Sequence, residues 1–223
     1  MKVGTDSILL SAWMNHPALV QRVLDIGSGT GILSLRAARC FPDAEILAVE
    51  IESGASEECR YNVDLNNDSE RIEVINRDIR DYHTEERFQL ILSNPPFFNG
   101  LVNDSKRRLA RIEDGLPLEH LMRKVEELLA YDGLFQMILP FSRMKDALSI
   151  ADSHHLFLQK CCYVSSRKGQ EPIRVLMSMG RERKTMTEHS TLNIYEGGHY
   201  SSSYINFTQE VYGKDVSGLE LGD

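Results

Sequence analysis

The segment Asn94-Pro95-Pro96-Phe97 combines groups that could activate an amine attached to an aromatic ring. Such an amine is a poor nucleophile because its lone pair is delocalised into the ring. The side-chain oxygen of Asn94 and the backbone carbonyl of Pro95 could each accept one of its N–H groups, which favours a pyramidal nitrogen. Pro95 and Pro96 stiffen the segment, and Phe97 offers a face on which a base could stack. A plain Asn-Pro turn is the simpler alternative.

A glycine-rich stretch, Asp25-Ile26-Gly27-Ser28-Gly29-Thr30-Gly31, forms a second candidate site. Glycines let the backbone turn sharply and let a ligand approach it closely. Glu50 follows at the end of the next apolar run, where a carboxylate could accept hydrogen bonds from the two hydroxyls of a ribose. The combination predicts a site for a cofactor that contains a nucleoside. For the glycines alone, a tight structural turn is the alternative.

The glycine spacing separates two kinds of cofactor. A dinucleotide site has the form G-x-G-x-x-G and places a pyrophosphate at a helix N-terminus. Here the form is G-x-G-x-G, preceded by the carboxylate of Asp25. S-adenosylmethionine carries a sulfonium and an ammonium group and no phosphate, so a nearby acid suits it and would repel a pyrophosphate. The residues therefore predict S-adenosylmethionine as the cofactor.

Both motifs require strands that end at a common edge. Short apolar runs predict strands at 23–26, 45–50, 72–75, 88–93 and 133–139. Helical spacing is found at 31–38, 54–65, 118–130 and 142–152. This alternation predicts an α/β fold, Rossmann-like and doubly wound, with a mostly parallel sheet. Runs at 157–164 and 175–179 have no helix between them, which predicts an antiparallel C-terminal hairpin and seven strands in all. A last short strand is a further candidate near 204–207.

No repeat, low-complexity tract or linker divides the chain, so a single domain is expected over residues 1–212. The acidic, glycine-containing tail at 213–223 is expected to be loose.

The D-x-G-x-G-x-G form after a first strand resembles motif I of the class I methyltransferases, which use S-adenosylmethionine. The resemblance implies that Glu50 binds the ribose of the cofactor. It also implies that Asp78, which follows the third strand, caps the adenine amino group. Ile51 and Ile79, each next to one of these acids, would then sandwich the adenine ring. For Asp78 alone, a helix cap is the alternative.

Asn-Pro-Pro-[Phe/Tyr] after the fourth strand resembles the amino-methyltransferases, which act on adenine N6 or cytosine N4 in DNA, guanine N2 in rRNA or glutamine N5 in release factors. The opening KVGTDSILLSAW, at residues 2–13, is similar to the tRNA1(Val) adenine N6-methyltransferase family. That likeness covers nearly the whole chain and implies methylation of the adenine at position 37 in tRNA.

The opening segment of that family closes over the methionine end of the cofactor, which implies contacts from Thr5 and Asp6. The alternative for this pair is capping of a helix whose apolar stripe contains Ile8 and Trp13. Members of the family usually carry a further segment before this stretch. The resemblance therefore implies that part of the cofactor lid, or an RNA contact, is missing from this sequence.

The net charge of −8 and the isoelectric point near 5.4 argue against a broad basic face for nucleic acid. The stretch at 99–115 nevertheless follows the candidate catalytic segment and contains basic residues. Lys106, Arg107, Arg108 and Arg111 could contact RNA phosphates. A solvated loop is an equally good interpretation, and neighbouring acids favour it.

The four cysteines form no C-x-x-C pair and no Cys/His cluster of zinc spacing, so reduced thiols and no metal are expected. No apolar run approaches the roughly 20 residues that span a bilayer. We therefore expect a cytoplasmic monomer whose partner is tRNA, without contact to a membrane.

Three alternatives stay open. Within enzymes, the target could be guanine N2 in rRNA or glutamine N5 in protein. A non-catalytic domain that binds cofactor or RNA is a second possibility, which an intact Asn94-Pro95-Pro96-Phe97 disfavours. A nicotinamide oxidoreductase is the third, and the glycine spacing disfavours it.

Overall fold

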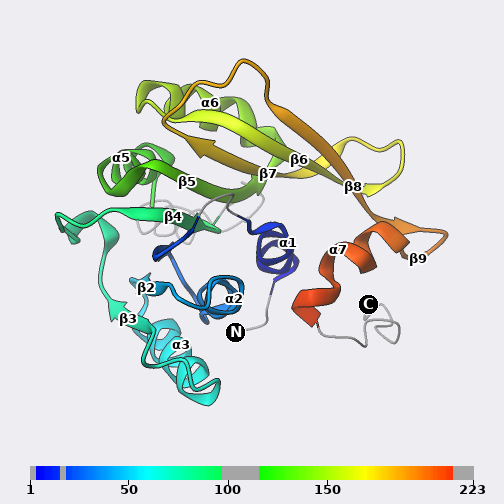
Figure 1. Cartoon of the computed structure of the whole chain (residues 1–223). Helices are drawn as coiled ribbons and strands as arrows, with labels where there is room; N and C mark the ends of the chain where they lie inside the picture. Colours follow the sequence, from blue (N-terminus) through cyan, green and yellow to red (C-terminus); the bar gives the residue numbers. More distant parts are fainter. Residues whose placement is uncertain (1–3, 16–18, 97–115, 213–223) are drawn as a thin grey trace, which may run out of the picture.

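A computed structural model describes residues 4–15, 19–96 and 116–212 of the 223-residue chain (Figure 1). A nine-stranded sheet with the order β3-β2-β1-β4-β5-β7-β6-β8-β9 runs through these residues. The strands are β1 (Arg22–Ile26), β2 (Glu45–Glu50), β3 (Ile72–Asn76), β4 (Phe88–Ser93), β5 (Leu129–Pro140), β6 (Phe157–Arg167), β7 (Pro172–Gly180), β8 (Glu188–Glu196) and β9 (His199–Tyr200).

The first five strands are mutually parallel, so their carboxyl ends meet at one edge of the sheet. β7 lies antiparallel between β5 and β6. β8 then runs parallel to β6, and β9 pairs antiparallel with the end of β8.

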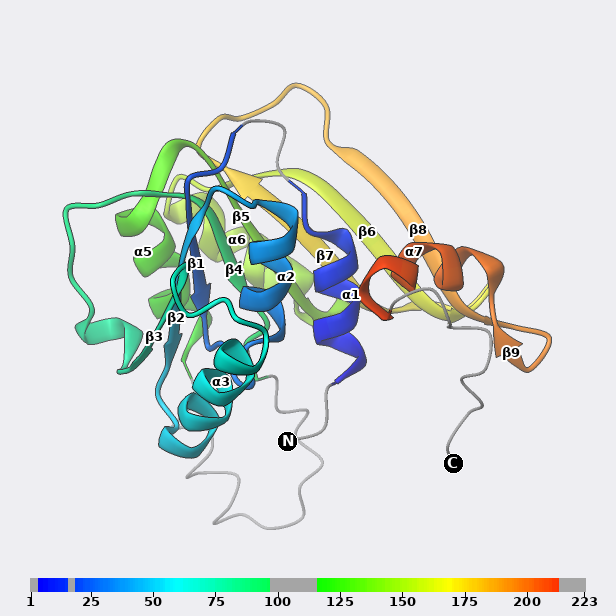
Figure 2. The ribbon, with the colours of Figure 1, turned by 60° about the horizontal axis from the view of Figure 1, so that its bottom comes forward.

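Helices cover both faces of the sheet (Figure 2). They are α1 (Thr5–Trp13), α2 (Ile32–Cys40), α3 (Ser53–Leu65), α5 (Leu118–Leu128), α6 (Met144–Ser153) and α7 (Ser202–Tyr212). α1, α2, α3 and α7 pack into the core on one face, and α5 and α6 pack into the core on the other. The central strands are buried on both faces, which explains why β1 and β4 read as continuous apolar runs rather than as alternating ones.

None of the helices in the described part of the chain has the length and apolar composition needed to cross a membrane.

The predicted fold class, a mostly parallel α/β sheet with an antiparallel hairpin, is confirmed, but the predicted number of seven strands is wrong. β8 was missed because the first four of its residues are exposed and polar, and β9 has only two residues. The segment at 204–207 is part of the helix α7 and not a strand. Tyr204 and Thr208 are both buried, and their spacing of four residues places them on one face of that helix.

Candidate active site

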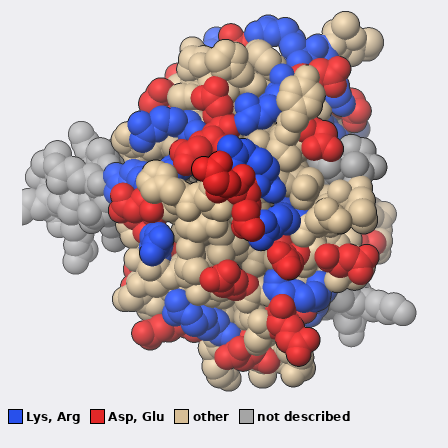
Figure 3. Space-filling view, turned by 60° about the vertical axis from the view of Figure 1, so that its left-hand side comes forward, with Lys and Arg blue, Asp and Glu red and all other residues tan. Residues whose placement is uncertain are grey.

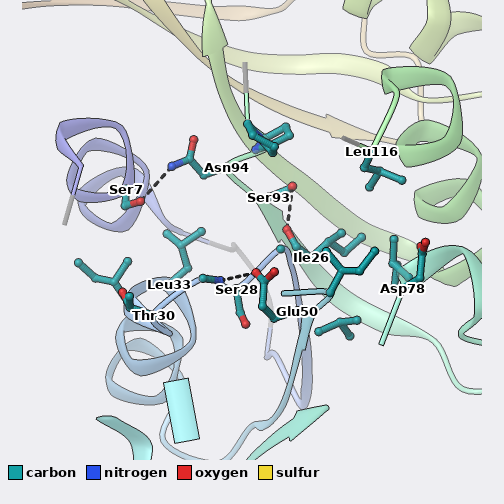
Figure 4. A pocket seen from close by; sticks show the side chains of 18 of the residues that line it. Ser7, Ile26, Ser28, Thr30, Leu33, Glu50, Asp78, Ser93, Asn94 and Leu116 are labelled. Carbon is teal, nitrogen blue, oxygen red and sulfur yellow. Dashed lines mark hydrogen bonds between the residues drawn. The ribbon is translucent and has the colours of Figure 1, made fainter. Parts of the chain in front are cut away.

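The carboxyl ends of the parallel strands open into a cavity of about 300 Å³ (Figure 4). Ligands of open parallel sheets bind at this edge. The walls come from the first turn of α1, the glycine loop after β1, the end of β2, the loop after β3 and the end of β4. The lining residues are Gly4, Ser7, Ile26, Gly27, Ser28, Gly29, Thr30, Ile32, Leu33, Val49, Glu50, Ile51, Arg77, Asp78, Ile79, Arg80, Ser93, Asn94, Pro95, Pro96 and Leu116.

The glycine loop turns back toward β2, because the backbone N–H groups of Gly27 and Ser28 donate to the Val49 carbonyl at 2.9 and 3.2 Å. Gly27 adopts a φ of +73°, which residues with a side chain rarely adopt. A methyl group placed at Gly27 would have no neighbour within 4 Å, since the cavity lies there. This part of the loop therefore presents bare backbone to a ligand.

Gly31 was predicted as a cofactor residue, but it is not among the residues that line the cavity. It precedes α2 with a φ of +86°, and a methyl group there would lie 2.7 Å from the Cys59 sulfur. Gly31 thus allows α2 to pack closely against α3.

Glu50 is only 8% exposed and is held by the two segments around it. Its Oε2 accepts the Gly29 N–H at 2.8 Å, and its Oε1 accepts the Glu52 N–H at 2.9 Å. Each carboxylate oxygen has a second lone pair, so the group retains capacity to accept hydroxyl groups. Glu50 is thus a fixed acceptor in the cavity wall.

Apolar and acidic groups line the part of the cavity that is formed by the residues after β2 and β3. Ile79 is 5% exposed, whereas Ile51 is 56% exposed and lies at the rim. Asp78 accepts the Arg80 N–H at 2.9 Å and caps the short 3-10 helix that follows. Hydrogen bonding to the Arg80 guanidinium lowers the pKa of Asp78, so this carboxylate stays charged at neutral pH. Asp78 both caps the turn and lines the cavity.

Asp25, predicted beside the cofactor, lies beneath the glycine loop and is not among the lining residues. It is fully buried, and Ser34 Oγ donates to its Oδ2 at 2.6 Å. Its Oδ1 has no hydrogen-bond partner among the described residues. Burial raises the pKa of Asp25 to about 7; the Ser34 hydrogen bond opposes this shift, and the negative charge of Glu50 adds to it.

The Asn-Pro-Pro segment begins where β4 ends. Ser93 Oγ donates to the Ile26 carbonyl at 2.9 Å and so ties the ends of β4 and β1 together. Asn94, Pro95 and Pro96 all line the cavity. In Figure 4, Asn94 and Asp78 lie on opposite sides of the cavity, with Glu50 between them.

Phe97 and the basic residues of the following stretch, Lys106, Arg107, Arg108 and Arg111, lie outside the described residues.

The first turn of α1 differs from its prediction. Gly4 is the N-cap, and no side chain caps the helix, so the capping interpretation of Thr5 and Asp6 is wrong. Gly4 and Ser7 line the cavity instead of Thr5 and Asp6. Sequence reasoning missed both Gly4 and Ser7, whose spacing of three residues places them on the same side of the helix.

No group of three or more His, Cys, Asp or Glu side chains is arranged to hold a metal within residues 4–15, 19–96 and 116–212.

Solved structures with a similar fold include methyltransferases. A protein from Agrobacterium tumefaciens, described as a predicted O-methyltransferase, superposes with a TM-score of 0.69 and 17% identity and covers 93% of this chain and 96% of its own. A TehB-like S-adenosylmethionine-dependent methyltransferase from Corynebacterium glutamicum has a TM-score of 0.53 at 15% identity, covering 80% of this chain and 89% of its own. The fold is thus that of the S-adenosylmethionine-dependent methyltransferases.

Sequence comparison identifies the family within this class. The family model of the methyltransferase small domain matches residues 2–138. Two curated proteins named tRNA1(Val) (adenine(37)-N6)-methyltransferase are similar over nearly their whole length. The protein from Porphyromonas gingivalis is 37% identical and covers 100% of this chain and 92% of its own, and the one from Bacteroides thetaiotaomicron is 34% identical, covering 95% and 90%.

The chain therefore belongs to the methyltransferase small-domain family and, within it, to the tRNA1(Val) (adenine(37)-N6)-methyltransferase family. It is an enzyme whose cofactor is S-adenosylmethionine.

Proposed function

We propose that the chain methylates the exocyclic N6 of adenine in tRNA, at position 37 of tRNA1(Val), the reaction that names its relatives. The observation that carries the proposal is the position of Asn94 in the lining of the cavity, on the edge that also holds the glycine loop. The Nδ2 of Asn94 donates to Ser7 Oγ at 2.9 Å, which leaves Oδ1 for the amine of the target base.

The cavity fits the cofactor by the chemistry of its lining. Its volume of about 300 Å³ is within the range of small-molecule sites. Glu50 would accept the ribose hydroxyls, and Ile51 and Ile79 would flank the adenine ring. Asp78 would accept the adenine amino group, while Gly27 and Gly29 leave room for the ligand. When bound, S-adenosylmethionine supplies an electrophilic methyl group on a sulfonium.

The remaining predicted cofactor residues would act without lining the cavity. Asp25 and Gly31 support the loop from beneath and from the side of α3. Thr5 and Asp6 belong to the turn of α1 that brings Ser7 to the cavity. We therefore assign these four residues to the support of the site.

Catalysis in this proposal rests on positioning. Asn94 Oδ1 and the Pro95 carbonyl accept the two N–H groups of the target amine and orient its lone pair. Preorganised acceptors of this kind need no strong general base. Pro96 stiffens the segment, and we propose that Phe97 stacks on the base.

The proposed RNA substrate is a polyanion, and the protein that binds it has a net charge of −8. On the face drawn in Figure 3, Lys and Arg side chains are interspersed with Asp and Glu and form no broad basic area. We therefore retain Lys106, Arg107, Arg108 and Arg111 as the proposed phosphate contacts, because they follow Asn94-Pro95-Pro96-Phe97 in the chain.

We also propose that residues 1–212 act as a single domain and that the enzyme works as a cytoplasmic monomer without a metal. One sheet running through the described residues supports the single domain.

The decisive experiment is transfer of a labelled methyl group to bulk tRNA, rRNA and protein, followed by mass spectrometry of nucleosides and amino acids. We expect N6-methyladenosine in tRNA. N2-methylguanosine in rRNA or methylated glutamine in protein would replace the proposed target. Cofactor binding without transfer to any of the three pools would favour a non-catalytic domain.

Two substitutions separate catalysis from cofactor binding. Asn94→Ala should lower methyl transfer by about 100-fold or more, since it removes one preorganised acceptor, while the Kd for S-adenosylmethionine stays nearly unchanged. Glu50→Ala should instead raise that Kd by about tenfold or more, because it removes a charged hydrogen-bond acceptor. Isothermal titration measures both values, with Glu50→Gln as a control of similar size. A weakened Kd in Asn94→Ala would contradict the role of Asn94, and an unchanged Kd in Glu50→Ala would contradict the role of Glu50.

A further inference from the structure

A continuous series of contacts joins β7 to Asn94 through the first turn of α1. Arg174 lies on β7, paired with Pro140 at the carboxyl end of β5. Its Nε donates to both carboxylate oxygens of Asp6, at 3.0 and 2.9 Å. Both side chains are about 30% exposed, at 30% and 28%, so the ion pair is partly shielded from water. The pair attaches the start of α1 to the sheet beside the cavity.

Ser7 follows Asp6 directly and contacts the catalytic amide. Its Oγ accepts a hydrogen bond from Asn94 Nδ2 at 2.9 Å. Figure 4 shows the nitrogen of Asn94 facing Ser7 and the oxygen turned away from it. A carboxamide donates only through its nitrogen and accepts only through its oxygen. A serine hydroxyl can both donate and accept, so the contact holds the amide in place; in the orientation seen, Nδ2 lies on Ser7 and Oδ1 is left for a target amine.

The orientation of that amide decides the chemistry. With Oδ1 toward the target, Asn94 accepts an N–H of the amine and makes its lone pair available. Rotated by half a turn, the NH₂ group would compete for the same lone pair that must attack the methyl group. A donor at that position would oppose the reaction, so the enzyme needs a group that holds the amide.

The first turn of α1 depends on the ion pair for its own position. The helix begins at Thr5, and its N-cap residue, Gly4, has no side chain to cap it. Farther along, Ile8, Leu9 and Leu10 are buried and anchor the rest of the helix by packing. The ion pair between Asp6 and Arg174 anchors the first turn of the helix, whereas apolar packing anchors the turns that follow.

We propose that Asp6 and Arg174 position Ser7, and that Ser7 holds the Asn94 amide with its oxygen toward the target amine. The inference rests on the proposed function, because it assigns residues that support the same reaction. Asn94 is the catalytic residue in this arrangement, and Ser7, Asp6 and Arg174 are positioning residues.

The first test compares Ser7→Ala with Ser7→Thr. Ser7→Ala removes the acceptor of one neutral hydrogen bond and should lower kcat about five- to tenfold, with the cofactor Kd and the RNA KM within about twofold of wild type. Ser7→Thr keeps the hydroxyl and should retain most of the activity. An unchanged kcat in Ser7→Ala overturns the proposal. A loss that appears in the cofactor Kd instead would make Ser7 a cofactor contact and also overturn it.

The second test addresses the ion pair. Asp6→Ala and Arg174→Ala should each lower kcat about two- to fivefold, as expected for a partly exposed pair. Adding either change to Ser7→Ala should cause little further loss, since all three act through Asn94. Glu210→Ala is the matched control, because Glu210 forms an ion pair with Arg36 that joins α7 to α2 away from the cavity. If the loss of kcat in each double variant equals the product of the two single losses, the residues act independently and the proposal is overturned.

A spectroscopic measurement separates this inference from the proposed function. The side-chain NH₂ resonances of Asn94 should shift in Ser7→Ala and stay near their wild-type positions in Ser7→Thr and Glu210→Ala. This result does not require any RNA substrate, so it is available even if methyl transfer to tRNA is not found. Unshifted resonances in a folded Ser7→Ala protein overturn the proposal. If Ser7→Ala does not fold, the same spectra of Asp6→Ala decide it.

Discussion

Asp25 carries its carboxyl group beneath the glycine loop, fully buried and hydrogen-bonded through one oxygen to Ser34. Burial disfavours the charged form and raises the pKa of Asp25 to about 7 from 3.8. Between these two values the folded protein holds a proton that the unfolded chain has released. The contribution of Asp25 to the free energy of unfolding therefore falls as the pH rises from about 4 to about 7.

Asp25→Asn should remove this dependence, because an amide stays neutral and its oxygen still accepts the Ser34 hydroxyl. At pH 8, without cofactor, we expect the variant to be more stable than wild type, by at most about 4 kcal/mol for a shift of about three pKa units. Denaturant unfolding at pH 5 and pH 8 measures the effect. Asp43→Asn is the control, since Asp43 is exposed. Parallel pH profiles for wild type and Asp25→Asn would disprove the assignment.

The contact between the start of α2 and α3 requires a glycine at position 31. Gly31 lies at the junction of the glycine loop and α2, in a left-handed conformation with a φ of +86°. The nearest atom to a methyl group there is the Cys59 sulfur on α3. Conformation and packing both require glycine at this position.

Gly31→Ala should lower the free energy of unfolding by about 1–3 kcal/mol, because it adds backbone strain and an overlap with Cys59. Adding Cys59→Ala should recover the part due to overlap and leave the part due to strain. Gly169→Ala is the matched control, since Gly169 has a similar φ of +81° but a methyl group there meets nothing within 4 Å. Chemical denaturation measures all four proteins. Equal stability of Gly31→Ala and Gly169→Ala would show that the overlap with Cys59 contributes nothing.

At the scale of the whole molecule, the cavity exists only when distant segments are folded together. The glycine loop follows β1, Glu50 ends β2, Asp78 follows β3 and Asn94 follows β4. A ligand of this cavity binds the folded chain and not the unfolded one, so it must stabilise the fold.

S-adenosylmethionine at about 100 times its Kd should add about 2.7 kcal/mol to the free energy of unfolding. For a chain of this length, that corresponds to a rise in Tm of roughly 5–10 °C. Thermal unfolding monitored by circular dichroism measures the shift, and NAD at the same concentration is the control. A shift with NAD and none with S-adenosylmethionine would contradict the assignment of the cavity.

The motifs of this protein are local, and for that reason the sequence alone determined much of it. The glycine loop, Glu50 and Asn94-Pro95-Pro96 are each read from a few adjacent residues, and the alternation of strands and helices predicts that they meet at one edge of the sheet. The cofactor and the fold class were predicted in this way, the family was predicted from the resemblance of its motifs, and all three are confirmed. The strand β8, whose first four residues are polar, and the helix α7 were not predicted, because contacts with neighbouring elements and not their own sequence patterns determine their structure.

Only the tertiary structure decided how the site is supported. Ser7 and Asn94 are 87 residues apart, and Asp6 and Arg174 are 168 residues apart, so no local pattern links them. Burial of Asp25 and the closeness of Gly31 to Cys59 are likewise results of packing. A residue's type gives the interactions that it can make, but its partners and its exposure to water are determined by the packing of the whole chain.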